Sequence, residues 1–420
     1  MEYQIFLLIL LVAFIPRTIL GHNVTTGKIV VDGTTKIAET DENFICFTLD
    51  IWPHDECSQP NLCVWDSHAS VLNLDLSLPI LNKAVQGNEL GGANSIGASV
   101  SAAQYAKDLL KLREMVDRLY ENSQQKPMIV APGAFFDDKW YHELVTKTGP
   151  NVVTALTHHI YNMGAGDDPK LIYRFVNPTY LSEVSKTFRQ LKNIVEKHAP
   201  WSSAWVGEAG GAYHGGAYRI SDTFINSFWY LDQLGMASLY NTKVYCRQTL
   251  VGGFYSVLKA KTFVPTPDYY GALLFHRLMG PGVLKVYNEV SPYLRTYAHC
   301  SREKSGVTML FINLSNTTEF TINVEDPMNL SLHKRGKPNY DSSSNDNVGT
   351  TEREEYHLTP QNGLLRSSTV LLNGKALELT KEGELPDLTP IYRDSNSSIN
   401  IATWSIAFVV IPDFVAIGCN

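Results

Sequence analysis

Two glutamates stand in sequence surroundings that suit acid–base or nucleophilic chemistry. Glu208 ends the apolar run WVGE and is followed by the glycine-rich stretch AGGAYHGGA, and Glu89 follows Asn88 in GNELGG. Glycines allow the backbone and a bulky ligand to approach each other closely. Taken separately, each glutamate is more simply explained as a solvated or ion-paired surface residue. Taken together, they predict two carboxyl groups on either side of a bound sugar.

Such a pair is what the hydrolysis of a glycosidic bond with retention requires. One protonated carboxyl expels the leaving oxygen and one ionised carboxylate traps the anomeric carbon, with about 5 to 5.5 Å between them. Asn88, beside Glu89, can hydrogen-bond the sugar 2-hydroxyl and hold the acid in place. The sequence therefore predicts a glycosidase.

Residues 43–280 carry the elements that would position these groups. Apolar strand-like runs alternate there with helical patterns, as a β/α architecture requires. Five runs predict strands, and they begin at Asn43, Pro127, Val152, Ala204 and Lys243. Three stretches predict helices: Ser99–Tyr120, Pro178–Lys197 and Ser221–Leu234. A carboxylate that closes a strand, as Glu208 does, would lie on the catalytic rim of a barrel.

The pattern changes after Gly280. Short strand-like runs begin at Val307, Glu319, Ser367 and Thr403, with polar turns between them. This pattern is typical of an antiparallel sandwich. The acidic, Ser-rich stretch Asp341–Glu355 predicts a surface loop.

Several motifs along the chain resemble heparanase and the plant heparanase-like proteins of glycoside hydrolase family 79. They are WDSHAS, GNEL, THHIYN, the Glu208 block followed by SDTF and WYLDQLG, VYCRQ and PDYY. The resemblance implies a (β/α)₈ barrel and a β-sandwich that is completed by an amino-terminal strand around Lys28–Ile37. It also implies retaining hydrolysis of β-linked glucuronides, with no cofactor. The expected partners are a polysaccharide or proteoglycan containing glucuronic acid, or a small-molecule glucuronide.

The resemblance also assigns residues. Glu208 matches the nucleophile and Glu89 the acid/base, and three residues match positions that line the sugar site: His159, Tyr213 and Tyr255. Cys300 and Cys419 resemble the pair that staples the sandwich. Of the two histidines that end a strand, His158 and His159, we expect one to face the barrel mouth and the other to pack outward. Arg247 is expected to pair with a rim acid, the alternative being a substrate carboxylate.

The chain departs from this family at one place. Only five barrel strands are recognisable, whereas a closed barrel of this type has eight. The shortage lies between Gln86 and Gly87, where the predicted first helix, Leu78–Gln86, joins the acid/base motif directly. We therefore expect weak or no activity, because a catalytic acid has to be held by a rigid scaffold. The alternatives are an inactive glycan-binding protein of the same fold and a related hydrolase of a neutral sugar such as an arabinoside.

The amino terminus predicts the compartment. An eleven-residue apolar run from Ile5 to Ile15 is of signal-peptide length and too short to span a bilayer. The predicted divisions are a signal peptide (1–21), the sandwich-joining strand (22–42), the barrel (43–280) and the sandwich (281–420). The protein is expected to be secreted, extracellular or in the cell wall, with the vacuole or lysosome as an alternative and at most peripheral membrane association.

Composition narrows the remaining classes. The chain has 420 residues, 44% of them hydrophobic, and a formal charge of −7, so it has no positive field with which to gather nucleic acid. There is no HExxH motif or pair of CxxC motifs, and no metal is implied. Cys57 and Cys63 are close enough to bridge within one loop. Five sequons fit a secreted glycoprotein: Asn23, Asn313, Asn316, Asn329 and Asn396.

Overall fold

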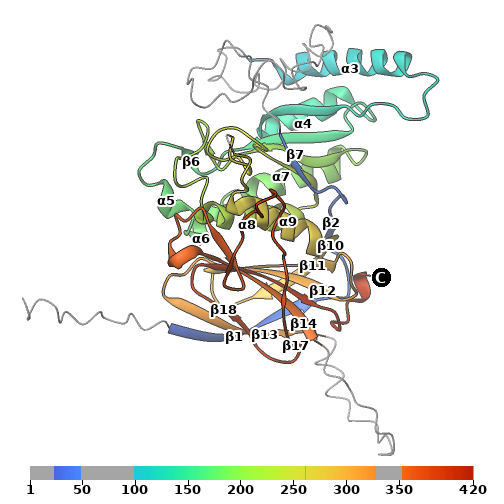
Figure 1. Ribbon diagram of the computed structural model, residues 1–420. Coiled ribbons are helices and arrows are strands. Elements are labelled where there is room, and N and C mark those ends of the chain that lie inside the picture. The colour runs from blue at the N-terminus through green and yellow to red at the C-terminus, as the bar shows by residue number, and fades with distance from the viewer. Residues whose placement is uncertain (1–22, 49–98, 261, 328–351, 420) are drawn as a thin grey trace, which may run out of the picture.

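The computed structural model describes residues 23–48, 99–260, 262–327 and 352–419. These residues form two main sheets that lie on either side of two helices, α8 (Phe224–Leu239) and α9 (Pro267–Leu278) (Figure 1). One sheet is parallel and has five strands, and the other has twelve. No helix in the described ranges is both long enough and apolar enough to cross a membrane.

The parallel sheet contains the five strands that the sequence predicts. They are β3 (Ile45–Phe47), β4 (Val130–Phe135), β5 (Ala155–Ile160), β7 (Ser203–Ala209) and β9 (Thr242–Arg247). The spatial order is β3-β9-β7-β5-β4, so the first strand lies beside the last, as it does where a β/α barrel closes. The sheet is open between β3 and β4 in the described part of the chain. Residues 49–98, which contain the Gln86–Gly87 junction, follow β3 in the sequence and lie outside the described residues.

Helices cover the outer face of this sheet. They are α3 (Ala102–Leu119), α4 (Asp138–Thr148), α5 (Leu171–Arg174), α6 (Pro178–Ser182) and α7 (Ser185–His198). Ser101 caps α3 by accepting a hydrogen bond from the backbone N–H of Gln104, which fixes where the predicted helix begins. Apolar residues of α3, α4 and α7 form one core with strands β5 and β7. The inner face is less covered, and Trp205 on β7 is only half-buried.

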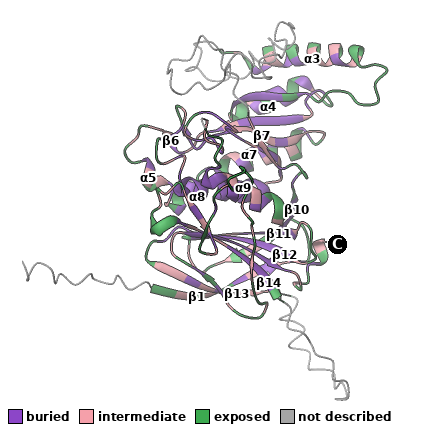
Figure 2. Cartoon of the chain, viewed as in Figure 1, coloured by how far each residue is buried: buried purple, intermediate pink, exposed green. Residues whose placement is uncertain are grey.

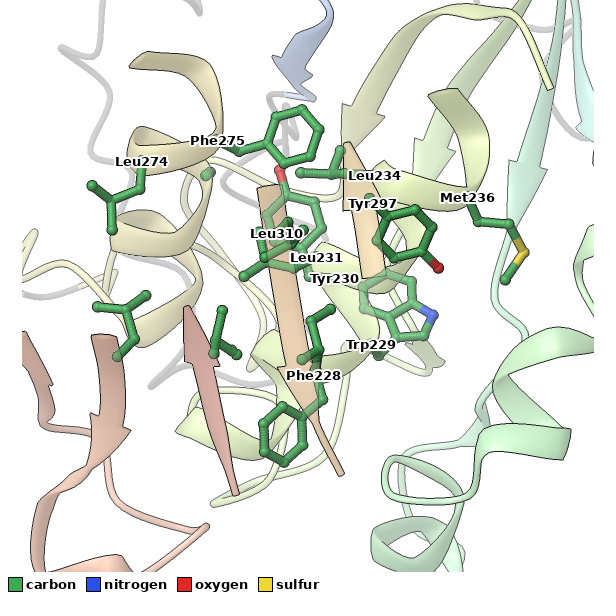
Figure 3. Packing of buried hydrophobic residues seen from close by; sticks show 14 of the residues in the cluster. Phe228, Trp229, Tyr230, Leu231, Leu234, Met236, Leu274, Phe275, Tyr297 and Leu310 are labelled. Carbon is green, nitrogen blue, oxygen red and sulfur yellow. The ribbon is translucent and has the colours of Figure 1, made fainter. Parts of the chain in front are cut away.

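Helix α8 is buried all round. Every residue from Phe224 to Ser238 is buried, unlike α3, which exposes one face (Figure 2). Its aromatic residues Phe228, Trp229 and Tyr230 pack in one cluster with Tyr297 and Leu310 of the larger sheet (Figure 3). A helix that is hydrophobic on all sides is expected to lie inside a protein. Each large side chain buried in this way contributes about 1.5–3 kcal/mol.

The twelve-stranded sheet is the predicted sandwich, together with the amino-terminal segment. Its strands are β1 (Asn23–Asp32), β2 (Ala38–Glu39), β10 (Met279–Asn288), β11 (Leu294–Ser301), β12 (Val307–Asn313), β13 (Thr318–Glu325), β14 (Glu352–Pro360), β15 (Val370–Leu372), β16 (Lys375–Ala376), β17 (Ile391–Asp394), β18 (Ile399–Ile401) and β19 (Ser405–Ile411). Strand β10 joins two layers, because its first half pairs with β11 and its second half with β1.

Strands β12 and β19 lie in the middle of the larger layer. Alternate residues of β12 face two different cores: Met309 and Phe311 contact β1 and β13, while Leu310 and Ile312 face α8. All seven residues of β12 and all seven of β19 are buried. Because both faces are covered, these strands appear in the sequence as continuous apolar runs without alternation.

Three details differ from the sequence expectation. The amino-terminal strand is Asn23–Asp32, earlier than Lys28–Ile37, and it pairs in parallel with β13, whereas the other strand pairs of this sheet are antiparallel. Residues 352–355 of the predicted surface loop belong to β14. Arg353, Glu354 and Glu355 are charged but buried. The hydrophobicity pattern therefore does not predict a strand here.

Two disulfides lie in the described residues. Cys300–Cys419 is confirmed and ties β11 to the carboxyl-terminal segment. Cys46–Cys246 was not predicted, and it joins β3 to β9 at residues that are directly paired in the sheet. Cys57 and Cys63 lie outside the described residues.

Candidate active site

Glu208 lies at the carboxyl end of β7, on the edge of the parallel sheet where the other strands also end. The pairing of β7 with β5 shifts between His158 and His159, so that His159 lies opposite Glu208 and Gly207 is the extra residue of a bulge. A Cβ at Gly207 would lie 2.1 Å from the Thr157 hydroxyl oxygen, so only glycine fits there. The bulge therefore sets the direction in which Glu208 points.

Two aromatic side chains from the end of β5 surround the Glu208 carboxylate. The hydroxyl of Tyr161 donates a hydrogen bond to Oε1, and Nδ1 of His159 lies 3.9 Å from Oε2. The Glu208 side chain is 29% exposed and that of His159 is 11% exposed. Glu208 is thus held by the Tyr161 hydroxyl, lies next to His159 and is still open to a ligand.

Tyr161 has its own supports. Its ring lies where a Cβ on Gly210 would be, since such an atom would approach Tyr161 Cε1 to 2.4 Å. Ring centroids of Tyr161 lie 6.2 Å from Phe135 and 6.4 Å from Tyr255. Tyr161 lies within the motif THHIYN but had no predicted role. The motif marks this segment as similar to the family, whereas the role of Tyr161 follows only from its contact with Glu208.

Tyr255 connects this group to the end of β9. Its ring is buried, and its hydroxyl accepts a hydrogen bond from Gln248 Nε2 at 3.5 Å. Gln248 also accepts a hydrogen bond from Thr48, which follows β3. The structure therefore brings together two of the residues expected at the sugar site, His159 and Tyr255.

The two histidines divide as expected. His159 faces Glu208, whereas His158 is fully buried beneath the helices, with Phe136 and Phe188 as ring neighbours. Burial, with a smaller effect from His159, lowers the pKa of His158 to about 3. His158 is therefore a neutral core residue.

The glycine-rich turn after Glu208 was expected to make room for a bulky ligand, and the structure differs from this expectation. Gly210 and Gly211 lie against the rings of Tyr161 and Trp229, Gly216 lies against the Tyr255 backbone and the Ser221 side chain, and Gly215 has open space. Three of these four glycines therefore admit other parts of the chain, not a ligand. Tyr213 is 41% exposed, and its ring contacts His214, 4.7 Å away between centroids.

Arg247 does not have either of its expected partners. It is fully buried and its guanidinium lies 3.0 Å from Asp268 of α9, with Trp229 and Tyr230 on its faces at 5.0 Å each. It also donates to the backbone oxygens of Ala209, at 3.2 Å, and Tyr255, at 2.7 Å. Arg247 therefore supports the residues next to Glu208 from within the core.

Some predicted residues lie elsewhere. Glu89, Asn88 and Asn329 are outside the described residues. Asn313 is fully buried and donates to two backbone oxygens at 2.8 Å, so the folded chain has no room for a glycan there. The sequon asparagines that are exposed are Asn23, Asn316 and Asn396. Among the described residues no three His, Cys, Asp or Glu side chains are placed to hold a metal ion.

The sequence matches the family described as glycosyl hydrolase family 79, N-terminal domain. The match has two parts, residues 26–87 and 86–235, which meet at Gln86–Gly87. The chain is also 39% identical to heparanase-like protein 1 of Arabidopsis thaliana, with 97% of each chain covered. The chain belongs to glycosyl hydrolase family 79.

Two other relatives are similar to this family member. Heparanase-like protein 2 of Arabidopsis thaliana is 38% identical, with 100% of each chain covered. Baicalin-beta-D-glucuronidase of Scutellaria baicalensis is 40% identical over 83% of this chain and 63% of its own. The alignment with heparanase-like protein 1 extends over 529 positions, more than the 420 residues of this glycoside hydrolase. The relative therefore has residues opposite gaps in this chain.

Solved structures show the same fold at low identity. A 4-O-alpha-L-rhamnosyl-beta-D-glucuronidase from Fusarium oxysporum has a TM-score of 0.53 at 14% identity, covering 75% of this chain and 65% of its own. An alpha-L-arabinofuranosidase from Thermotoga maritima has a TM-score of 0.53 at 14% identity, covering 77% and 64%. This family 79 chain thus spans about two thirds of the length of these barrel hydrolases.

Proposed function

We propose that this chain is a retaining β-glucuronidase of the heparanase type, in which Glu208 is the nucleophile. The position of Glu208 supports this proposal: it ends a central parallel strand, remains accessible and receives a hydrogen bond from Tyr161. A donated hydrogen bond favours the ionised form of a carboxylate, which is the form that attacks. The relatives named for heparanase and for a β-D-glucuronidase indicate a glucuronide as substrate.

The reaction has two steps. The Glu208 carboxylate forms a bond to the anomeric carbon while the bond to the leaving oxygen breaks, and Glu89 supplies the proton to that oxygen. Water then attacks the glycosyl-enzyme ester, Glu89 takes its proton, and Glu208 is released. His159 lies beside the attacking carboxylate and Tyr255 beside Tyr161, and both orient the sugar.

The acid/base is where this chain is expected to be weak. Glu89 lies two residues after the junction at which the family match is divided. The strands on either side of the open edge, β3 and β4, are the ones that the missing segment would connect. We propose that Glu208 is in place while its partner lacks a rigid support, so that turnover is weak.

Turnover of a chromogenic substrate by the wild type and by variants tests both the activity and the role of Glu208. We expect the purified chain to release p-nitrophenol from p-nitrophenyl β-D-glucuronide slowly, and Glu208→Gln to abolish the release. Glu143→Gln, an exposed glutamate on α4, is the matched control and should keep wild-type turnover. Turnover that survives in Glu208→Gln would refute the assignment.

A fluorinated substrate distinguishes the stereochemical course. With 2-deoxy-2-fluoro-β-D-glucuronyl fluoride, we expect a covalent adduct on the peptide that contains Glu208, found by mass spectrometry. An adduct on another residue would reject Glu208 as nucleophile. Tyr161→Phe should lower the rate of adduct formation about 10-fold, the usual effect of losing one hydrogen bond to a charged group.

The alternative function is that of an inactive glycan-binding protein of the same fold, and the open edge between β3 and β4 favours it. It predicts no turnover and no adduct, with glycan binding that persists in Glu208→Gln. A panel of aryl glycosides that includes arabinosides tests for a neutral-sugar hydrolase in the same experiment.

We also propose that the protein is secreted and glycosylated at the exposed sequons, on the basis of the apolar amino-terminal run and the exposure of Asn23, Asn316 and Asn396. Peptide-N-glycosidase treatment of the secreted protein should lower its mass, and each Asn→Gln substitution should remove one glycan. Retention of the chain inside the cell would reject the proposal.

A further inference from the structure

The sandwich contains a cavity that the proposed reaction does not use. Its volume is about 600 Å³, and strands β13, β14, β17 and β18 and the start of β19 supply its walls. The strands that line it lie on the far side of α8 and α9 from β7, which carries Glu208 (Figure 1). The volume is in the range of small-molecule sites. The lining is mainly charged and hydroxyl-bearing, so the cavity suits a polar ligand.

One face of β14 supplies the charged wall. Arg353, Glu355 and His357 alternate along the strand and all line the cavity. Nε of the Arg353 guanidinium lies 2.7 Å from Glu355 Oε1, and the guanidinium also donates to backbone oxygens of residues 394–398. Burial acts to raise the pKa of Glu355, but hydrogen bonds from His357 and Arg353 hold it below the ordinary value. Arg353 and Glu355 therefore form an ion pair that has no net charge and is fixed in place by hydrogen bonds.

A second arginine leaves the cavity positively charged. Arg393 of β17 lies directly opposite Arg353 in the ladder and lines the same cavity. Like charges on opposite residues destabilise a sheet. Glu355 compensates Arg353, whereas the exposed Arg393 forms no ion pair with any described residue. This arrangement leaves one cationic group with which an anionic ligand can pair.

Neutral hydrogen-bonding groups lie across from this charge. His357 donates through Nε2 to Glu355 at 2.7 Å, and its Nδ1 has no partner among the described residues. On the opposite layer, Thr321 donates to Asn400 Oδ1 at 3.0 Å, which leaves the Asn400 amide group as a donor. Donors and acceptors on both walls, around one uncompensated cation, match a ligand with many hydroxyls and few charges.

We propose that this cavity is a second, non-catalytic glycan site that binds a short acidic saccharide, with a uronate carboxylate on Arg393 and hydroxyls on His357 and Asn400. A phosphate or sulfate ion alone would use the cation and leave most of the neutral groups without partners. The site is independent of Glu208, so it can be present in an enzyme or in a glycan-binding protein of this fold.

The test uses a probe without a β-glucuronide. Trigalacturonic acid and neutral cellotriose are titrated into the full-length chain by calorimetry, and hydrogen–deuterium exchange locates the bound region. We expect trigalacturonic acid to bind and to protect residues 352–360 and 391–402, with no protection of 203–213. Protection confined to the barrel strands, or no binding of either saccharide, would overturn the proposal.

Two exposed positions allow variants that do not disturb the core. Arg393→Ala should weaken binding of trigalacturonic acid about 10- to 100-fold, the loss of one charge-assisted hydrogen bond. Asn400→Asp keeps the side-chain shape and the acceptor for Thr321 but replaces the amide donor with a negative charge, so it should weaken the binding of trigalacturonic acid more than the binding of cellotriose. Arg189→Ala, an exposed arginine on α7, is the matched control and should bind as wild type. Equal loss of both saccharides in Asn400→Asp would indicate a structural role and reject the charge recognition.

Discussion

The two sheets of this family 79 hydrolase differ in how far each is completed. The sandwich sheet has its amino-terminal strand in place, and its central strands β12 and β19 are buried on both faces. Within the described part of the chain, the parallel sheet has five strands, open edges at β3 and β4, and the half-buried Trp205 on its inner face. Burial supplies most of the stability of a fold, so the sandwich and α8 are expected to support the catalytic sheet. The parallel sheet carries Glu208, on which the proposed activity depends.

The largest expected effect comes from completing the parallel sheet. Insertion of the corresponding segment of a family relative between Gln86 and Gly87 should raise kcat/KM on a β-glucuronide about 10²- to 10⁴-fold, the usual contribution of a positioned general acid. The same insertion with Glu89→Gln should lose most of the gain. An unchanged rate in a well-folded insertion variant would mean that the open edge does not limit this enzyme.

The next effect concerns the contact between the two sheets. Asp232 of α8 is buried and lies 2.7 Å from Arg295 Nε and 2.6 Å from the Tyr297 hydroxyl, both on β11. Asp232→Ala should lower the free energy of unfolding by about 3–5 kcal/mol, because it leaves a buried arginine unpaired. Urea denaturation measures this. Asp117→Ala, which breaks an exposed pair with Lys126, is the control and should cost less than about 1 kcal/mol.

The disulfides allow the two regions to be compared directly, since the described residues of each region contain one. Replacing either pair by serine should lower the free energy of unfolding by about 2–4 kcal/mol. The Cys46–Cys246 pair closes a span of 200 residues and Cys300–Cys419 one of 119, so loop entropy makes the first more stabilising by about 0.5 kcal/mol. Thermal and urea unfolding of the two double variants would show this order. The reverse order would mean that the parallel sheet is already loosened when folded.

The smallest effect is a pH dependence from two buried histidines. Burial lowers the pKa of His158 to about 3 and, in the sandwich, that of His299 to about 4. Both stay neutral in the fold and gain protons on unfolding, so their stabilisation is present above pH 6.5 and lost as the pH falls. Between pH 6.5 and 5, each of these two histidines should lower the free energy of unfolding by about 2 kcal/mol.

His158→Phe isolates the contribution of the parallel sheet. Its ring neighbours are Phe136 and Phe188, so the new ring meets apolar surroundings. The slope of unfolding free energy against pH should fall by about 1.1 kcal/mol per pH unit, averaged over this window. Phe136→Leu changes the packing without changing titration and should keep the slope. An unaltered slope in His158→Phe would show that His158 is protonated in the folded chain.

The strands that appear in the sequence as apolar runs were predicted, whereas features that depend on contacts between distant residues were not. The five strands of the parallel sheet and the strands β12 and β19 appear as apolar runs, and all were found near their predicted positions. Strand β14 was missed because its buried residues include Arg353 and Glu355, which pair with each other. Cys46–Cys246 was missed because the first and last strands of a barrel meet only after folding. Asn313 has a sequon, but its burial depends on contacts with residues 318 and 402.

The sequence alone determined that Glu208 ends a strand, because periodicity is a local property of the chain. The resemblance to the family supplied the expectation that Cys300 pairs with Cys419 and that the chain departs from the family at Gln86–Gly87. Only the tertiary structure decided that Tyr161 holds Glu208, that Arg247 is a core residue and that Arg353 and Arg393 face one cavity. These contacts depend on strand register and on a bulge at Gly207, and a shift of one residue would point each side chain to the opposite face.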